Sequence, residues 1–129
     1  MNNNNNGPLS GVRVADLTSV LLGPFATQIL GDHGADIIKV ESLEGDTTRD
    51  IGPRHSDDMA AVYMTANRNK RSLAIDLKDP EGRESFLEFL KTVDVFVHNM
   101  RPSAIKRLGL TYEDVRKANP SIVYCGAYG

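Results

Sequence analysis

The sequence predicts an α/β fold, in which a parallel β-sheet is flanked by helices. Two observations carry this prediction. Short runs rich in β-branched residues alternate with helix-like patterns along the chain, and the first of these segments form a β-α-β unit. The connection in such a unit is right-handed and its two strands are parallel. A length of 129 residues corresponds to about one domain.

The first unit is the clearest. Residues 12–16 are predicted to form one strand and residues 36–41 the next. Between them, Gly23 and Pro24 open a helix, because proline lacks a backbone donor that the first helical turn leaves unused anyway. Gly34 is expected to end this helix in the left-handed conformation that glycine adopts without strain.

The rest of the chain continues the alternation. Strands are predicted at residues 72–77, 94–98 and 121–125, and helices at residues 60–66, after the N-cap Asp79, and after a capping box at Thr111. Residues 67–71 are predicted to form a polar, basic turn before the strand at 72–77. The run at 94–98 is almost continuously apolar, which is typical of a central strand covered on both faces. Residues 42–58 show no period, and loops of that length are often functional.

Both ends of the chain carry signals of their own. Residues 1–7 are a methionine, five asparagines and a glycine, which predicts a disordered or tag-like tail. The last predicted strand runs into a glycine-rich turn without a closing helix, although a parallel strand normally needs a crossover. We therefore expect this sequence to be the N-terminal piece of a longer protein.

Charge and composition exclude several functions. Fifteen Lys and Arg against seventeen Asp and Glu give a net charge of −2, which argues against nucleic acid or a membrane surface as partner. No apolar run approaches the ~20 residues of a membrane span, and no signal peptide is present. The single cysteine, Cys125, cannot form an internal disulfide, which favours a cytoplasmic location. Because it lies in an apolar strand, Cys125 is expected to be buried and inert.

Ligands of parallel α/β sheets bind outside the carboxyl ends of the strands. Five segments qualify: residues 19–23, Glu41 with Ser42, residues 76–78, residues 98–101 and the glycine-rich end. The first is a weak dinucleotide motif, because residues 19–24 hold one glycine where the fingerprint needs three. Basic residues also cluster near these ends, and they predict either a solvated rim or a site for an anionic phosphate: Arg68, Lys70, Arg71, Lys78, Arg101, Lys106 and Arg107.

The nucleophile and metal motifs are absent from the sequence. His33, His55 and His98 share no ligand spacing with Cys125, so no metal site is predicted. His98 ends a buried strand, which indicates a hydrogen-bonded core residue. No serine lies in a G-x-S-x-G elbow. The residues alone therefore name no catalyst.

A series of motifs resembles the class III CoA-transferases, the CaiB/BaiF family. They include Pro-Leu-Ser-Gly-Val-Arg-Val at residues 8–14, Gly-Pro-Phe-Ala-Thr at 23–27, Gly-Ala-Asp-Ile-Ile-Lys-Val-Glu at 34–41, Gly45-Asp46 with Arg49, Asn-Arg-Asn-Lys-Arg-Ser at 67–72, Asp-Leu-Lys-Asp-Pro-Glu-Gly at 76–82, Asp94-Val95, Asn99, Arg101-Pro102, Leu-Gly-Leu at 108–110 and Asn119-Pro120. The resemblance covers residues 8–129. It implies a Rossmann-like CoA-binding domain, of which residues 8–129 would be the N-terminal part.

The family resemblance also implies an activity. Coenzyme A, the carrier, would pass from an acyl-CoA to a small carboxylic acid through an aspartyl-CoA thioester, with no metal. The subunits would form an interlocked homodimer. The family's nucleophilic aspartate would lie beyond Gly129, so this chain would contain no catalytic residue and would be inactive by itself.

The resemblance assigns coenzyme contacts position by position. They are Leu21, Leu22, Ser42, Ile75, Asp76, Leu77, Lys78, Asn99, Met100, Arg101 and Arg107. Lys78 and Arg107 would meet the charged end of the ligand, and the apolar residues would pack around its adenine and pantetheine parts. The chain departs from the family pattern at Ser19, Ser42, His98 and Ser103, where histidine, arginine, glutamate and glycine respectively occur in other members.

Two other functions remain open at this stage. The chain could be a fragment of a 2-methylacyl-CoA racemase, which shares the N-terminal half and uses an Asp/His pair. It could also be a non-catalytic CoA-binding or assembly module, because the family aspartate is missing from it. The acyl pocket of the family draws largely on later residues, so the sequence does not specify the acyl group or the acceptor acid.

Overall fold

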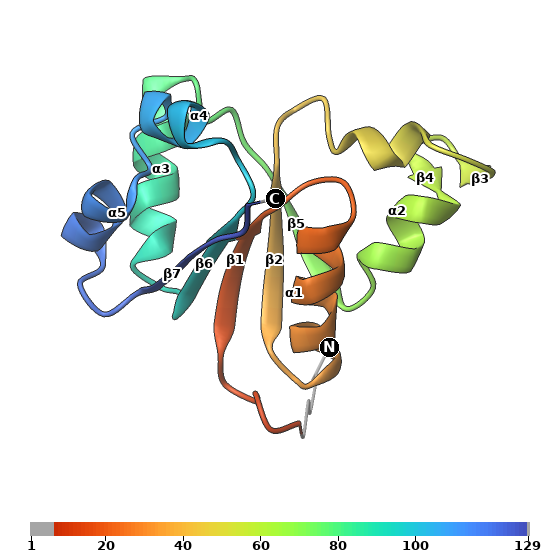
Figure 1. Ribbon diagram of the computed structural model, residues 1–129, viewed down its shortest axis with the longest axis horizontal. Helices are drawn as coiled ribbons and strands as arrows, with labels where there is room; N and C mark the ends of the chain where they lie inside the picture. Colours follow the sequence, from red (N-terminus) through yellow and green to blue (C-terminus); the bar gives the residue numbers. More distant parts are fainter. Residues whose placement is uncertain (1–6, 129) are drawn as a thin grey trace.

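Five parallel strands form the sheet on which the rest of the chain is arranged (Figure 1). The computed structural model describes residues 7–128. The strand order is β5-β2-β1-β6-β7, with β1 in the centre. The strands are β1 (Arg13–Leu17), β2 (Asp36–Glu41), β5 (Lys70–Ala74), β6 (Val95–His98) and β7 (Val123–Gly126). This arrangement confirms the predicted parallel α/β fold.

Helices cover the two faces unequally. On one face lie α1 (Leu22–Asp32) and the short α2 (Ala61–Ala66), whereas α3 (Pro80–Leu90), α4 (Pro102–Arg107) and α5 (Tyr112–Ala118) lie on the other (Figure 1). The larger core cluster lies on the second face and is built around Phe86, Leu90 and Phe96, all of which are fully buried. A smaller cluster that includes Val14 and Ile37 lies against α1.

Most element starts follow the predicted local chemistry. The Asp79 side chain caps α3 by accepting from the Gly82 amide at 3.0 Å, and Pro80 is the first helical residue. Thr111 and Asp114 form the expected capping box of α5. Gly34 has a φ of 101°, as its role at the end of α1 requires. Helix α1 begins at Leu22, two residues before the predicted Pro24.

The structure differs from the prediction in four segments. Strand β5 spans Lys70–Ala74 rather than 72–77, because the basic residues that were expected in a turn pair with β2 instead. The predicted loop 42–58 contains a short 3-10 helix, η1 (Thr47–Asp50), and the strand β3 (Arg54–Ser56), which forms a hairpin with β4 (Met59–Ala60). Helix α2 (Ala61–Ala66) follows where a helix was predicted, whereas α4 was not predicted. Gly7 was assigned to the tail, but it belongs to the first turn of the fold, where its carbonyl accepts from the Ser10 amide at 3.0 Å. The rest of the predicted tail lies outside the described residues.

Cys125 is exposed, so the prediction of a buried thiol was wrong. Strand β7 is the edge of the sheet, and Val123 and Cys125 point to the face that carries α1. That helix packs over β1 and β2 and leaves this part of the face uncovered (Figure 1). An apolar strand pattern shows that a face can be buried, but it does not show what covers it.

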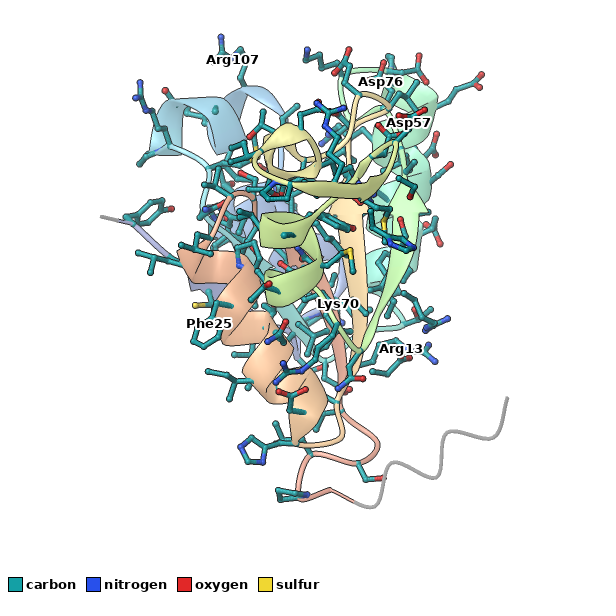
Figure 2. The ribbon with its side chains drawn as sticks, turned by 90° about the vertical axis from the view of Figure 1, so that its right-hand side faces the viewer. Arg13, Phe25, Asp57, Lys70, Asp76 and Arg107 are labelled. Carbon is teal, nitrogen blue, oxygen red and sulfur yellow. The ribbon has the colours of Figure 1, made fainter. Side chains whose placement is uncertain are left out.

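Lys70 is the most unusual residue of β5, because its side chain is only 2% exposed. Its ammonium donates to the Asp16 carboxylate at 2.9 Å, to the Thr27 hydroxyl at 2.8 Å and to the carbonyl of Pro24 at 2.8 Å. Burial lowers the pKa of Lys70, and the Asp16 carboxylate opposes this effect. The contact ties β5 to β1 and α1, and Figure 2 shows Lys70 at the side of the sheet near this helix.

We expect Lys70→Met to lower the free energy of unfolding by about 3–5 kcal/mol, because it leaves the buried carboxylate of Asp16 unpaired. Lys91→Met is the matched control. Its ammonium pairs with Glu88 on the surface, where such a pair contributes about 0–1 kcal/mol. Urea unfolding of both variants measures the difference. Equal losses in the two variants would contradict the structural role of Lys70.

His98 lies at the end of β6 and is fully buried, as predicted. Its Nδ1 atom accepts from the Met100 amide at 3.2 Å, which assigns the ring proton to Nε2. Nε2 has no partner among residues 7–128. The ring is surrounded by Phe96, Tyr124 and Tyr128, with centroids 5.2–5.8 Å away. Burial lowers the pKa of His98 below its ordinary value.

A neutral, buried histidine makes stability depend on pH. The unfolded chain takes up a proton near pH ~6.5, whereas folded His98 resists it, so this stability is present above pH ~6.5 and is lost as the pH falls toward the folded pKa. We expect the urea midpoint to fall between pH 7 and pH 5.5, and His98→Asn to flatten that slope. His33→Asn is the control, because His33 is exposed. Identical slopes in the two variants would show that His98 is not the group responsible.

Candidate functional site

A cavity of about 280 Å³ opens at the carboxyl ends of the strands. Its walls come from the ends of β1 and β2 and from the segments that follow β1, β2, β5, β6 and α4. The lining residues are Leu17, Thr18, Ser19, Val40, Glu41, Ser42, Leu43, Glu44, Gly45, Asp46, Ile75, Asp76, Leu77, Lys78, Met100 and Leu108. The sheet edge predicted from topology is therefore where the structure is hollow.

The structure brings six of the eleven predicted contact residues together at this cavity. They are Ser42, Ile75, Asp76, Leu77, Lys78 and Met100. The four consecutive residues among them leave the sheet where β5 ends, and the Asp76 carboxylate turns the backbone by accepting from the Lys78 amide at 2.9 Å. This turn explains why the strand is shorter than predicted at its carboxyl end.

The other five predicted residues lie outside the lining. Asn99 is one step removed, because its side chain bonds both the amide and the carbonyl of Ser19, a lining residue, at 3.0 and 2.9 Å. Leu21 is the N-cap of α1 and Leu22 is its first residue, and both are exposed. Arg101 is the N-cap of α4 and Arg107 lies in its last turn, next to the lining residue Leu108. Figure 2 shows Arg107 at the same end of the molecule as Asp76.

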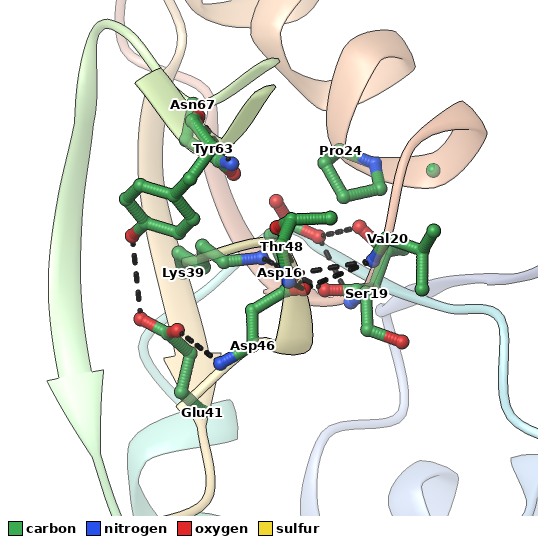
Figure 3. A network of polar contacts seen from close by, with 12 residues as sticks. Asp16, Ser19, Val20, Pro24, Lys39, Glu41, Asp46, Thr48, Tyr63 and Asn67 are labelled. Atoms are coloured by element: carbon green, nitrogen blue, oxygen red, sulfur yellow. Dashed lines mark hydrogen bonds and ion pairs between the residues drawn. The ribbon is translucent and has the colours of Figure 1, made fainter. Parts of the chain in front are cut away.

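Sequence reasoning gave no function to Asp46, which lies at the centre of a buried polar network (Figure 3). Its carboxylate accepts from the Lys39 ammonium at 3.0 Å, from the amide and hydroxyl of Thr48 at 3.0 and 2.8 Å, and from the Val20 amide at 3.1 Å. Burial raises the pKa of Asp46, but the bonds from Thr48 and Lys39 outweigh it, so the pKa is lowered. The carboxylate is therefore charged and fully occupied.

The signal that could have found Asp46 is Lys39. This lysine interrupts the apolar run of β2 and its side chain is 1% exposed. A buried ammonium needs an acidic partner. The loop that follows β2 holds several acids, and Asp46 is one of them.

Glu41 ends β2 and is likewise committed. The Arg49 guanidinium binds it with two bonds, from Nε at 2.9 Å and from Nη2 at 2.7 Å, and the Asp46 amide donates to it at 2.9 Å. Burial raises the pKa of Glu41, but these donors outweigh it and hold the pKa below its usual range. A carboxylate with these partners is not free to bind a ribose, which is what an acid in the corresponding place does in dinucleotide-binding folds.

Tyr63 of α2 closes this group from the side. Its hydroxyl lies 2.5 Å from Arg49 Nη2, and burial beside Glu41 raises the pKa of Tyr63 to about 12. The tyrosine therefore stays neutral. Within residues 7–128, no group of three or more histidine, cysteine, aspartate or glutamate residues is placed to hold a metal ion.

Comparison with known proteins identifies the relatives of this chain. The family model for CoA-transferase family III matches residues 9–129. The human succinyl-CoA:glutarate CoA-transferase is 46% identical over 127 residues, which is 98% of this chain and 29% of that protein. The formyl-CoA:oxalate CoA-transferase of Streptomyces coelicolor is 42% identical over 122 residues, which is 94% of this chain and 30% of that protein.

Solved structures agree with the family match. A CaiB/BaiF family protein from Brucella suis superposes with a TM-score of 0.87 at 40% identity, covering 93% of this chain and 33% of that one. A hypothetical protein from Mycobacterium tuberculosis gives a TM-score of 0.88 at 36% identity, covering 95% and 34%. The chain spans about 30% of the length of the curated relatives. On this evidence the chain belongs to CoA-transferase family III.

Proposed function

We propose that this chain is the coenzyme-binding part of a CoA-transferase, which moves coenzyme A between an acyl-CoA and a small carboxylic acid. One observation carries the proposal: six of the eleven residues to which the family resemblance assigns coenzyme contacts line one cavity. The relatives at 40–47% identity carry the names of CoA-transferases that act on acids such as glutarate and oxalate.

The cavity has the chemistry that a part of coenzyme A requires. Val40, Ile75 and Leu77 give it apolar walls, which suit adenine or the pantetheine arm. Lys78 lines the cavity, and Arg107 lies in the last turn of α4, next to the lining residue Leu108. Both side chains are cations that can bind the phosphates. A volume of about 280 Å³ holds only a portion of the coenzyme, so the remainder would run along the surface past α4 and the start of α1.

In the proposed reaction, a carboxylate nucleophile attacks the acyl-CoA carbonyl, and the CoA thiolate leaves as a mixed anhydride forms. The thiolate then attacks the aspartyl carbonyl, which releases the first acid and leaves an aspartyl-CoA thioester. The acceptor acid repeats the two steps in reverse order. The buried aspartates of this chain, Asp16 and Asp46, are held by Lys70 and Lys39, so we assign these residues to the fold and the nucleophile to the family aspartate outside this sequence.

The partner is proposed from the exposed face of α1, and the location from the cysteine content. The outer face of α1 exposes Leu22, Phe25 and Ile29 by 83%, 48% and 41%, and an apolar stripe of this kind fits the interlocked homodimer that the family resemblance implies. No helix among residues 7–128 is long and apolar enough to cross a membrane. The cytoplasmic location rests on the single cysteine.

The two other functions gain less support. The named curated relatives are CoA-transferases, and no observation in the site favours the racemase. A non-catalytic module would bind coenzyme A through the same cavity. Binding therefore tests the part of the proposal that this chain can perform.

We expect the chain to bind coenzyme A in calorimetry, and Lys78→Ala and Arg107→Ala each to weaken the affinity about 3- to 10-fold, because each removes one phosphate contact. Pantetheine, which lacks the phosphates, should bind the variants and the unchanged chain equally. Arg54→Ala is the control, because Arg54 lies in the hairpin and pairs on the surface with Asp50. Absence of CoA binding, or equal weakening by all three variants, would refute the proposed site.

A further inference from the structure

Val20 has a backbone conformation that its side chain disfavours. Its φ is 71°, in the left-handed region. Within residues 7–128, two other non-glycine residues have a positive φ, Asp58 and Asn69, and both are types that tolerate it. A β-branched residue there is strained, and such strain persists only where the surroundings hold it.

The carboxylate of Asp46 supplies this hold. Both of its oxygens face the Val20 amide, at 3.1 and 3.3 Å. Lys39 connects the same two segments, because its ammonium donates to the Asp46 carboxylate and to the carbonyl of Thr18, each at 3.0 Å. The turn after β1 is thus fixed to the loop after β2 through one buried carboxylate (Figure 3).

This turn forms part of the cavity. Ser19 lines it and is fixed on its other side by Asn99. The next residue is Val20, which is followed by Leu21, the N-cap of α1, and Leu22, its first residue. The dihedral angles of Val20 therefore set the direction in which the chain passes from the cavity wall into the helix, along the segment assigned to coenzyme contacts.

We propose that Asp46 is a positioning residue for coenzyme binding, which acts by holding Val20 in the left-handed conformation and so fixes the course of residues 19–22. We call the hydrogen bonds from the Val20 amide to Asp46 the clamp. The identity of the ligand rests on the proposed function, whereas the clamp does not. The simpler alternative is that Asp46 only neutralises Lys39. The two explanations predict different results for a substitution at position 20. If Asp46 acts by holding Val20, a residue that adopts a positive φ without strain will compensate for the loss of Asp46. If Asp46 only neutralises Lys39, that residue will not compensate.

The test combines substitutions at the two positions and measures CoA affinity by calorimetry. Asp46→Asn should weaken binding about tenfold, and adding Val20→Gly should restore it to within about threefold of the unchanged chain, because glycine adopts positive φ freely. Adding Val20→Ala should restore nothing, because alanine retains the steric penalty of a Cβ atom. Equal weakness of the two double variants would overturn the proposal and leave Asp46 as the partner of Lys39.

Amide hydrogen exchange of Val20 tests the clamp without a ligand. The amide should be protected in the unchanged chain and should exchange much faster in Asp46→Asn. Fast exchange in the unchanged chain would overturn the proposal whether or not coenzyme A binds. If the unchanged chain shows protection but no CoA affinity, the proposed function fails while the clamp stands.

Should Asp46→Asn not fold, the single variants at position 20 decide the matter. With Asp46 in place, Val20→Gly should raise the urea midpoint above that of Val20→Ala, because only glycine relieves the strain. A midpoint of Val20→Gly at or below that of Val20→Ala would show that the position stores no strain, and would overturn the proposal.

Discussion

Two lysines buried in the sheet, each paired with a buried aspartate, determine the arrangement of the segments around the candidate site. An ammonium removed from water costs several kcal/mol unless a charged and hydrogen-bonded partner offsets it. Lys39 in β2 therefore requires Asp46, and Lys70 in β5 requires Asp16. The first pair fastens the long loop after β2 over the turn after β1, and the second fastens the edge strand beneath α1. Breaking either pair would leave a buried charge without a partner of opposite charge, so these contacts restrict where the connecting segments can lie.

The cavity follows from that restriction. Its walls belong to segments far apart in the sequence, which meet because parallel strands end at one edge. The strands alone would leave these segments mobile, since loops have few buried contacts of their own. Asp46 and Asn99 each bond the turn at residues 18–20 from opposite sides, and Arg49 binds Glu41 behind it. The result is a site whose backbone is held by buried charge and whose lining is mainly apolar.

The sequence predicted most of the fold and part of the site, for identifiable reasons. Helix starts at Asp79 and Thr111 were readable because capping depends on residues three positions apart. The cavity residues after β5 could be predicted because ligands of parallel sheets bind at the carboxyl ends of the strands, and because these residues belong to a family motif. Lys70 was read as part of a turn, since its place in a strand depends on Asp16, 54 residues earlier. Asp46 was missed for a similar reason, and Cys125 was misjudged because the covering of an edge strand is not a property of that strand.

The hydrogen bonds of the buried acids indicate that these acids have a structural role and are not nucleophiles. Asp16, Glu41 and Asp46 stand at or just beyond strand ends, where a catalytic carboxylate could be expected from topology alone. Each is bonded to a cation and to further donors, and donors of this kind stabilise the charge while reducing its availability as a nucleophile. A nucleophilic carboxylate needs an oxygen lone pair free to attack the acyl carbon, whereas the oxygens of these three acids already accept hydrogen bonds from those donors. Their physical contribution is to hold the backbone around the cavity in one arrangement.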